Sequence, residues 1–135
     1  MRRVAYVAHK LSAPTREQML ENGRAAALWG CWLARHFNVA VVADWIWMSS
    51  VLEETAENRD LGLNCDVALV SRCDVLIHTG VVVSAGMKLE AEYAKAVIDL
   101  TPLGFPLPKD DHWCLRDVGA LLREHGIRRS LPGDV

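Results

Sequence analysis

Short apolar runs alternate along this chain with longer segments in which apolar residues return every three or four positions. Continuous apolar runs of a few residues, rich in β-branched side chains, are typical of strands in a parallel sheet. Such runs occupy residues 4–8, 39–43 and 75–77, and residues 97–98 are a candidate for a fourth, short strand. We expect the run at 39–43 to be buried on both faces.

The segments between these runs predict helices. They cover about residues 15–37, 55–72, 85–95 and 114–125. The first helix begins at the Thr-x-x-Gln capping pattern of Thr15 and Gln18, and the last ends at Gly126, a typical helix terminator.

Three further features concern the inward face of one helix and the structure of two less regular segments. In the helix over 55–72 the apolar side chains of Leu61, Ala68 and Leu69 are predicted to face inward. Residues 44–54 fit a loop or a short helix equally well. Three prolines make residues 101–111 unsuited to regular structure.

Strands that alternate with helices imply parallel βαβ units. We therefore expect an α/β fold: a single-domain open parallel sheet of the flavodoxin or Rossmann type, with helices on both faces. The domain should span residues 1–127, followed by a mobile tail at 128–135. Sheets of this kind bind ligands beyond the carboxyl ends of their strands, which brings residues 9–14, 44–48 and 79–86 together.

The composition excludes several classes of protein. A chain of 135 residues with a net charge of −2 predicts one globular domain without a basic surface for a nucleic acid polymer or a membrane. No apolar run approaches the roughly 20 residues of a membrane helix, and we expect no signal or transit peptide. The four cysteines form no CxxC pair, so we expect buried free thiols, Cys31 and Cys65 among them. We therefore expect a cytoplasmic protein without a metal or a cofactor.

The segment from Ser84 to Glu90 is the strongest candidate for a binding site. It leaves a predicted buried strand and enters a helix, whose free backbone N–H groups favour anions and hydroxyl-rich ligands. Gly86 allows a ligand to approach the backbone closely, and Glu90 lies about one turn further on. The alternative is that Ser84 is an N-cap and Glu90 a favourable charge in the first turns. Glu92, two residues on, must point elsewhere.

A second group of candidates lies on one face of the predicted helix over 55–72. Arg59, Gly62 and Asp66 are spaced i, i+3 and i+7, which places them on the same face. The Asp66 carboxylate could orient a sugar hydroxyl or act as an acid. The alternative is a charged face exposed to solvent.

Further candidates follow the first two strands. Tyr6 lies in the first strand, where a buried phenol needs a partner, and a hydrogen bond to Glu90 would position that carboxylate. His9 and Lys10 follow this strand and could bind a phosphate or a base. Trp45 and its neighbour Trp47 could stack on a base or lie in a dimer interface.

Taken together, these segments resemble the nucleoside 2-deoxyribosyltransferase-like superfamily, which includes nucleotide N-glycosidases. The likeness covers roughly residues 3–98. It is carried by residues 4–9, 59–66 and 72–76 and, most specifically, by the pattern Ser84-x-Gly86-x-x-x-Glu90-x-x-Tyr93-Ala94.

The resemblance implies a role for each matched residue. Glu90 corresponds to the nucleophile that attacks the anomeric carbon, and Tyr6 to the tyrosine that holds this glutamate. Asp66 corresponds to the aspartate that assists at the sugar or the base. Ser84 corresponds to a serine beside the sugar, which contacts the 5'-phosphate in nucleotide-cleaving members. The resemblance also implies a homodimer or larger homo-oligomer, in which a neighbouring chain completes the site.

Two departures from the superfamily limit what the resemblance implies about the substrate. His9 and Lys10 stand where many relatives have a glycine-rich loop. Beyond residue 98 the chain has no match to the base-binding residues of the transferases.

We therefore expect an enzyme that cleaves or transfers the N-glycosidic bond of a nucleoside or nucleoside 5'-monophosphate through a glycosyl-Glu90 intermediate. Water would resolve the intermediate in a hydrolase, and a second base would do so in a transferase. One alternative is a non-catalytic module of the same fold that binds or senses a nucleotide. A flavodoxin-like redox or phosphotransfer protein is disfavoured, because the chain has no GxGxxG or Walker loop and Asp44 alone does not make a phosphoacceptor.

Overall fold

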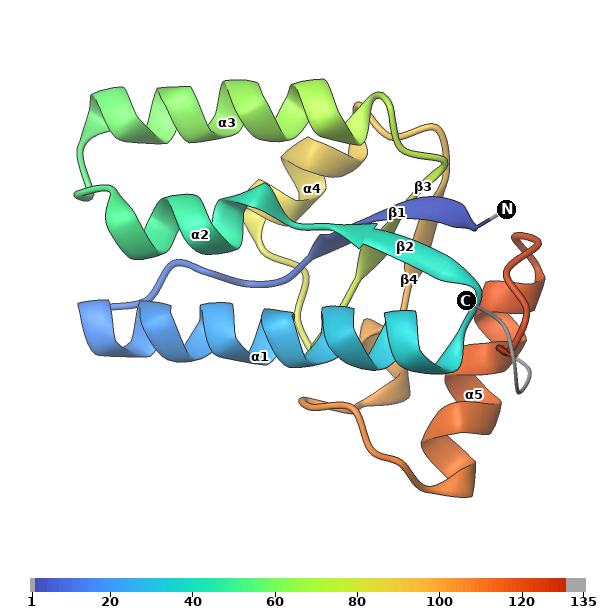
Figure 1. The fold of residues 1–135 in the computed structure, drawn as a ribbon. Coiled ribbons are helices and arrows are strands. Elements are labelled where there is room, and N and C mark those ends of the chain that lie inside the picture. Colours follow the sequence, from blue (N-terminus) through green and yellow to red (C-terminus); the bar gives the residue numbers. More distant parts are fainter. Residues whose placement is uncertain (1, 131–135) are drawn as a thin grey trace.

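The computed structural model describes residues 2–130 and contains the predicted parallel sheet (Figure 1). Its strands are β1 (Arg3–Ala8), β2 (Val39–Val42), β3 (Val75–His78) and β4 (Val97–Asp99). They are all parallel in the order β2-β1-β3-β4. The prediction of an open parallel α/β sheet, including its short fourth strand, is confirmed.

Helices connect the strands, and most of them begin at side-chain caps. They are α1 (Arg16–His36), α2 (Asp44–Val51), α3 (Ala56–Val70), α4 (Ala85–Ala91), the 3₁₀ helix η1 (Thr101–Leu103) and α5 (His112–Arg123). The predicted cap Thr15 accepts from the Gln18 N–H, and Ser84 accepts from the Met87 N–H. Of residues 44–54, where sequence alone left two choices, residues 44–51 form α2 and the rest are not helical. Helix α4 is shorter than predicted, because Tyr93 N–H bonds back to the Glu90 carbonyl three residues away and the helix unwinds.

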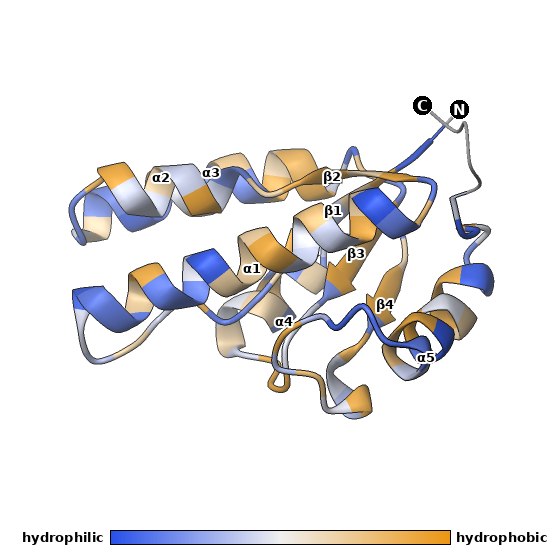
Figure 2. Ribbon diagram, turned by 60° about the horizontal axis from the view of Figure 1, so that its bottom comes forward, coloured by the Kyte–Doolittle hydropathy of each residue, from blue (hydrophilic) through white to orange (hydrophobic). Residues whose placement is uncertain are grey.

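Two hydrophobic clusters cover the two faces of the sheet. Helices α1 and α5 pack on one face with a core of large side chains that includes Trp29, Leu33 and Phe37. Helices α2, α3 and α4 lie over the other face, where Tyr6 and Leu76 point. Figure 1 shows α1 and α5 on the opposite side of the sheet from α3 and α4, and Figure 2 shows the strands as mainly hydrophobic ribbons between them. The predicted helices on both faces are confirmed.

Several predicted burials are wrong. Strand β2 is an edge strand, so the prediction that it is buried on both faces fails, and Ala40 is exposed. Leu61 and Ala68 are exposed and do not line the cavity, because the face of α3 that borders it carries Gly62 and Asp66 instead, and Leu69 is only half-buried. Cys31 is exposed, on the outer face of α1, rather than buried.

The segment after α5 is held against the end of α1. The Asn38 N–H bonds to the Arg128 carbonyl, the Ser130 N–H bonds to the His36 carbonyl, and Phe37 pairs antiparallel with Arg129. Residues 128–130 of the predicted tail are therefore fixed, whereas 131–135 lie outside the described residues. Within residues 2–130, no helix combines the length and the apolar character needed to cross a membrane.

Candidate functional site

A cavity of about 390 Å³ lies beyond the carboxyl ends of the strands, where α2 and α3 form a hairpin past the edge of the sheet (Figure 1). All three segments that were predicted to meet there contribute to its lining. They supply His9, Leu11 and Ser12 after β1, Trp45 and Met48 after β2, and Ser84, Ala85 and Gly86 after β3. The inner face of α3 forms a further wall. Arg59, Gly62 and Asp66 all line the cavity, as their spacing predicted.

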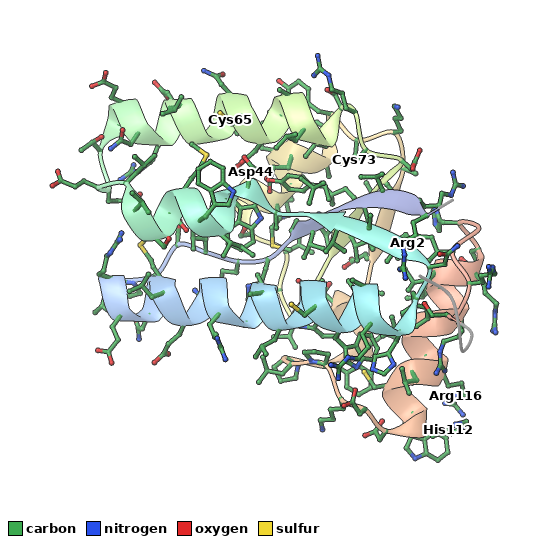
Figure 3. All side chains as sticks on the ribbon, viewed as in Figure 1. Arg2, Asp44, Cys65, Cys73, His112 and Arg116 are labelled. Carbon is green, nitrogen blue, oxygen red and sulfur yellow. The ribbon has the colours of Figure 1, made fainter. Side chains whose placement is uncertain are left out.

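Four acidic groups converge at the inner end of this cavity. Glu90 from α4 and Asp66 from α3 line it, and Glu90 is only 8% exposed. Tyr6 from β1 and Asp44 from the start of α2 are buried and are not part of its lining. Figure 3 shows Asp44 where β2 leads into α2, on the side that faces α3. The fold thus gathers one acidic group from each of four separate elements.

Several oxygens in this cluster lack hydrogen-bond partners. The Tyr6 hydroxyl, both Asp44 carboxylate oxygens and Asp66 Oδ1 are buried and unpaired. Tyr6 and Glu90 interact, because the Glu90 charge raises the pKa of Tyr6 after the larger effect of burial. The predicted hydrogen bond between Tyr6 and Glu90 contributes to the pKa shifts of both groups, although the Tyr6 hydroxyl makes no bond of ordinary geometry. Buried polar groups seldom remain unpaired, so this cluster is either a binding site or holds a shared proton.

Burial and mutual repulsion shift the acid–base properties of the cluster. Burial raises the pKa of Glu90 to about 7, and the Asp44 charge adds to this shift while Tyr6 and Asp66 oppose it. Burial also raises the pKa of Asp66 well above its ordinary range, with Asp44 as the next cause. The site therefore combines a carboxylate that ionises near neutral pH with a carboxyl that retains its proton, a pairing suited to nucleophilic and acid catalysis.

The loop before α4 presents small polar groups to the cavity. Ser84 is the N-cap of α4, as the alternative interpretation of this residue predicted, and it also lines the cavity. Its Oγ accepts from Met87 N–H at 3.3 Å, and the hydroxyl hydrogen remains available to a ligand. Gly86 is exposed and would allow a ligand to lie against the backbone, whereas Glu92 is exposed and points away from the cluster.

His9 and Lys10 differ in their relation to the cavity. Lys10 is exposed and does not line it. His9 lines it, and His9 Nδ1 lies 2.7 Å from the Lys10 carbonyl, so this nitrogen carries the hydrogen. Burial lowers the pKa of His9, which leaves the neutral ring with Nε2 as an acceptor. The ring packs against Gly80, which has a φ of +81°, and a Cβ there would lie 2.8 Å from Nε2.

The remaining candidates are Arg59 and the two tryptophans. The Arg59 Nε donates to Glu54 Oε1 at 2.7 Å, so this guanidinium is already paired. Trp45 is buried, lines the cavity and donates from its indole Nε1 to the Val7 carbonyl at 2.9 Å, which ties α2 to β1. Trp47 is 63% exposed and does not line the cavity.

Asp44 is the residue of this site that sequence reasoning did not select. Its only sequence signal was its position immediately after an apolar run, at the carboxyl end of a predicted strand. Among residues 2–130, no group of three or more His, Cys, Asp or Glu side chains is arranged to hold a metal ion.

Comparison with known proteins gives a family and no closer relative. No curated protein and no solved structure matches the chain. A family model does match, over a range that runs from β1 into β4 and includes Tyr6, Asp44, Asp66 and Glu90. Residues 4–98 match the domain of unknown function DUF7768, and the chain belongs to that family.

Proposed function

We propose that this protein cleaves or transfers the N-glycosidic bond of a nucleoside or nucleotide through a glycosyl intermediate on Glu90. The observation that carries the proposal is the pairing of Glu90 and Asp66 on the wall of one cavity, both with pKa values raised by burial. Retaining glycoside cleavage uses two carboxyl groups in this way, one as the nucleophile and one as the acid. The resemblance of residues 3–98 to the nucleoside 2-deoxyribosyltransferase-like superfamily supports the same roles, and we propose that the family is a branch of it.

The first step forms an ester between Glu90 and the sugar. A Glu90 carboxylate oxygen attacks C1' while the C1'–N bond breaks and its electron pair passes to the base nitrogen. Asp66 donates the proton that the departing base needs, a contribution typically worth about 10²–10⁴-fold in rate. Water or a second base then displaces Glu90 from C1', giving hydrolysis or transfer respectively.

The surroundings of Glu90 suit a sugar and a base. Cavities that bind small molecules usually measure about 300–1,000 Å³, and this one measures about 390 Å³. Ser84 and Gly86 offer a hydroxyl and open backbone beside Glu90 for sugar hydroxyls. The apolar walls include Trp45 and Met48, which provide a surface for a planar base.

The deciding experiment incubates the protein with a panel of nucleosides and 5'-nucleotides, alone and with a second free base. Released or exchanged base, together with a mass increase equal to one sugar on the trapped protein, supports the proposal. Glu90→Gln should lower turnover by roughly 10³-fold or more, as expected for a lost nucleophile. Glu92→Gln is the matched control on the same helix turn, since Glu92 is exposed, and it should leave turnover unchanged. Binding without turnover across the panel, unaltered by Glu90→Gln, would instead identify a nucleotide-sensing module.

We also propose that the protein forms a homodimer or larger homo-oligomer through the outer faces of α2 and α3. Trp47, Val51 and Leu61 are large apolar side chains on these helices, exposed by 63%, 77% and 48%. Exposed apolar groups of this kind mark interfaces, and they lie beside the elements that enclose the cavity. Sedimentation of the wild type and of Trp47→Glu tests this, and a wild type that is monomeric at high concentration would reject it.

A further inference from the structure

Asp44 occupies an unusual position for a carboxylate. It is 6% exposed, it begins α2 directly after β2, and neither of its oxygens has a hydrogen-bond partner. It lies behind the cavity wall and is not one of the residues that line it. A buried and unpaired carboxylate is costly, and it becomes tolerable when a neighbour shares a proton with it.

The groups that face Asp44 are themselves acids. They are Tyr6 from β1, Asp66 from α3, Cys73 from the turn after α3 and Glu90 from α4, each of which feels the Asp44 charge. No ion pair to Asp44 is present in the described part of the chain. A proton held between two carboxyls is therefore the available way to satisfy these oxygens.

We propose that Asp44 is a positioning residue that accepts a hydrogen bond from the protonated Asp66 carboxyl and so keeps the Asp66 proton ready for the leaving base. The proposal rests on the proposed function of the site. It assigns the charge to Asp44 and the proton to Asp66, and it gives the two carboxyls different tasks.

Two features decide which carboxyl holds the proton. Asp44 lies in the first turn of α2, where the helix dipole favours a negative charge. Asp66 lies about one turn from the C-terminus of α3, where the helix dipole does not favour a negative charge, and it borders the cavity. The Asp44 interaction is also the largest cause, after burial, of the raised pKa of Asp66. The proton therefore resides on the carboxyl that faces the substrate.

In the bond-breaking step, the Asp66 O–H bond gives its proton to the base nitrogen that receives the electron pair of the C1'–N bond. Asp66 is left as a carboxylate beside the Asp44 carboxylate, and this repulsion makes it a strong base. The second step relieves this repulsion, because Asp66 takes a proton from the attacking water. At the same time the water oxygen bonds to C1' and the Glu90 ester breaks. Protons and electrons balance over the cycle without any further reactant.

The test replaces Asp44 with asparagine, which keeps the size of the side chain and removes its charge. Carbon-13 NMR of labelled aspartates then follows the Asp66 carboxyl through a pH titration, with Asp66→Asn used to assign its signal. We expect the Asp66 midpoint to fall in Asp44→Asn and to return in Asp44→Glu, whereas Asp60→Asn, an exposed change on α3, leaves it in place. An unchanged midpoint in a folded Asp44→Asn protein would overturn the proposal. If Asp44→Asn does not fold, the same comparison is made between wild type and Asp44→Ser, which also removes the charge and in which a lowered Asp66 midpoint is expected.

Turnover provides an independent readout that a merely structural role would not affect. A pyridinium riboside has a leaving group that departs neutral and needs no proton, whereas a purine or pyrimidine nucleoside needs one. We expect Asp44→Asn to slow base release in a single turnover at least about tenfold for the ordinary nucleoside and to leave single-turnover release from the pyridinium substrate unaffected. Equal losses on both substrates would overturn the proposal. A wild type that is inactive on every nucleoside would reject the proposed function, while the titration would still decide whether Asp44 controls Asp66.

Discussion

On the side of the sheet covered by α1 and α5, buried polar side chains mostly have hydrogen-bond partners, with Ser130 Oγ at the end of α1 as an unpaired exception, whereas the face covered by α2, α3 and α4 holds unpaired acids. On the first face the indole of Trp29 donates to the Pro106 carbonyl and that of Trp32 donates to Asp110. On the second, unpaired buried oxygens belong to Tyr6, Asp44 and Asp66. The same sheet thus supports a packed core on one side and a polar cavity on the other.

This difference separates stability from chemistry within one small domain. Close packing makes an interior sensitive to the loss of a single methylene group, so the α1 and α5 face should carry most of the stability. Unpaired buried acids lower stability and are retained where they serve a function. The contrast between the faces can therefore be tested by measuring both properties in the same variants.

The largest expected effect comes from truncation of the packed face. Leu33→Ala should lower the free energy of unfolding by about 2–5 kcal/mol, because Leu33 is fully buried between α1 and the sheet. Leu63→Ala, the matched change on the half-buried cavity wall, should cost about 1 kcal/mol or less. Urea unfolding measures the free energy of unfolding of both variants. Equal losses of stability would show that the two faces are packed alike.

The second prediction concerns the pH dependence of stability. Glu90 has an ordinary pKa of 4.5 and a folded value of about 7, so between these values the folded state binds more protons than the unfolded state. Stability from this group is therefore complete below pH 4.5 and is lost as pH rises to about 7, by on the order of 3 kcal/mol.

The control for this prediction removes the titrating group. Burial lowers the pKa values of His9 and His78, and their contribution has the opposite sign because it is lost as pH falls. The difference between wild type and Glu90→Gln isolates the glutamate. This difference should grow from pH 5 to pH 8, and a constant difference would contradict a raised pKa.

A smaller effect is expected from the charge of the cavity. Of the described residues that line it, Arg59 carries the permanent positive charge and is paired with Glu54. We expect a nucleoside to be preferred over its 5'-monophosphate by about tenfold in kcat/KM, because the phosphate meets Glu53 and Glu54 without a free cation. Glu54→Gln should reduce the ratio of kcat/KM for the nucleoside to that for the monophosphate. Glu57→Gln, on the first turn of α3, should leave this ratio unchanged. A preference for the monophosphate would contradict the prediction.

The smallest predicted effect tests the polar contacts of the packed face. Trp32→Phe keeps an aromatic ring beside Trp29 and removes the 2.9 Å bond from Nε1 to Asp110. We expect a loss of about 1 kcal/mol in unfolding free energy, since Asp110 is exposed and also contacts His36. Turnover should be unaffected. A change in kcat with unchanged stability would show that the two faces are coupled.

Most of the fold could be predicted because its signals are local. Apolar runs at β1 and β3 and the cap at Thr15 depend on neighbours in the sequence, and all are found in the structure. Helix α2 could not be assigned from the sequence, because consecutive apolar residues, among them Trp45, Ile46 and Trp47, place apolar side chains on every side of it. No side chain caps its N-terminus. Such a segment has no face that identifies it as a helix.

The site could be predicted only in part, for a related reason. Spacing placed Arg59 and Asp66 on one helix face, and both reach the cavity. Asp44 could not be selected from the sequence, because its burial depends on α3 and α4, which follow it in the chain. The burial of β2 was wrong for the same reason, since the position of a strand in the sheet is a property of the whole topology.

The contact between Gly80 and His9 makes the shape of the cavity adjustable from outside it. Gly80 is not part of the lining, yet any side chain at this position would meet the imidazole at 2.8 Å. The ring would have to move, and the open space beside it is the cavity. A side chain at Gly80 would therefore change the space open to a ligand, at the cost of the strain that a non-glycine residue meets at a φ of +81°.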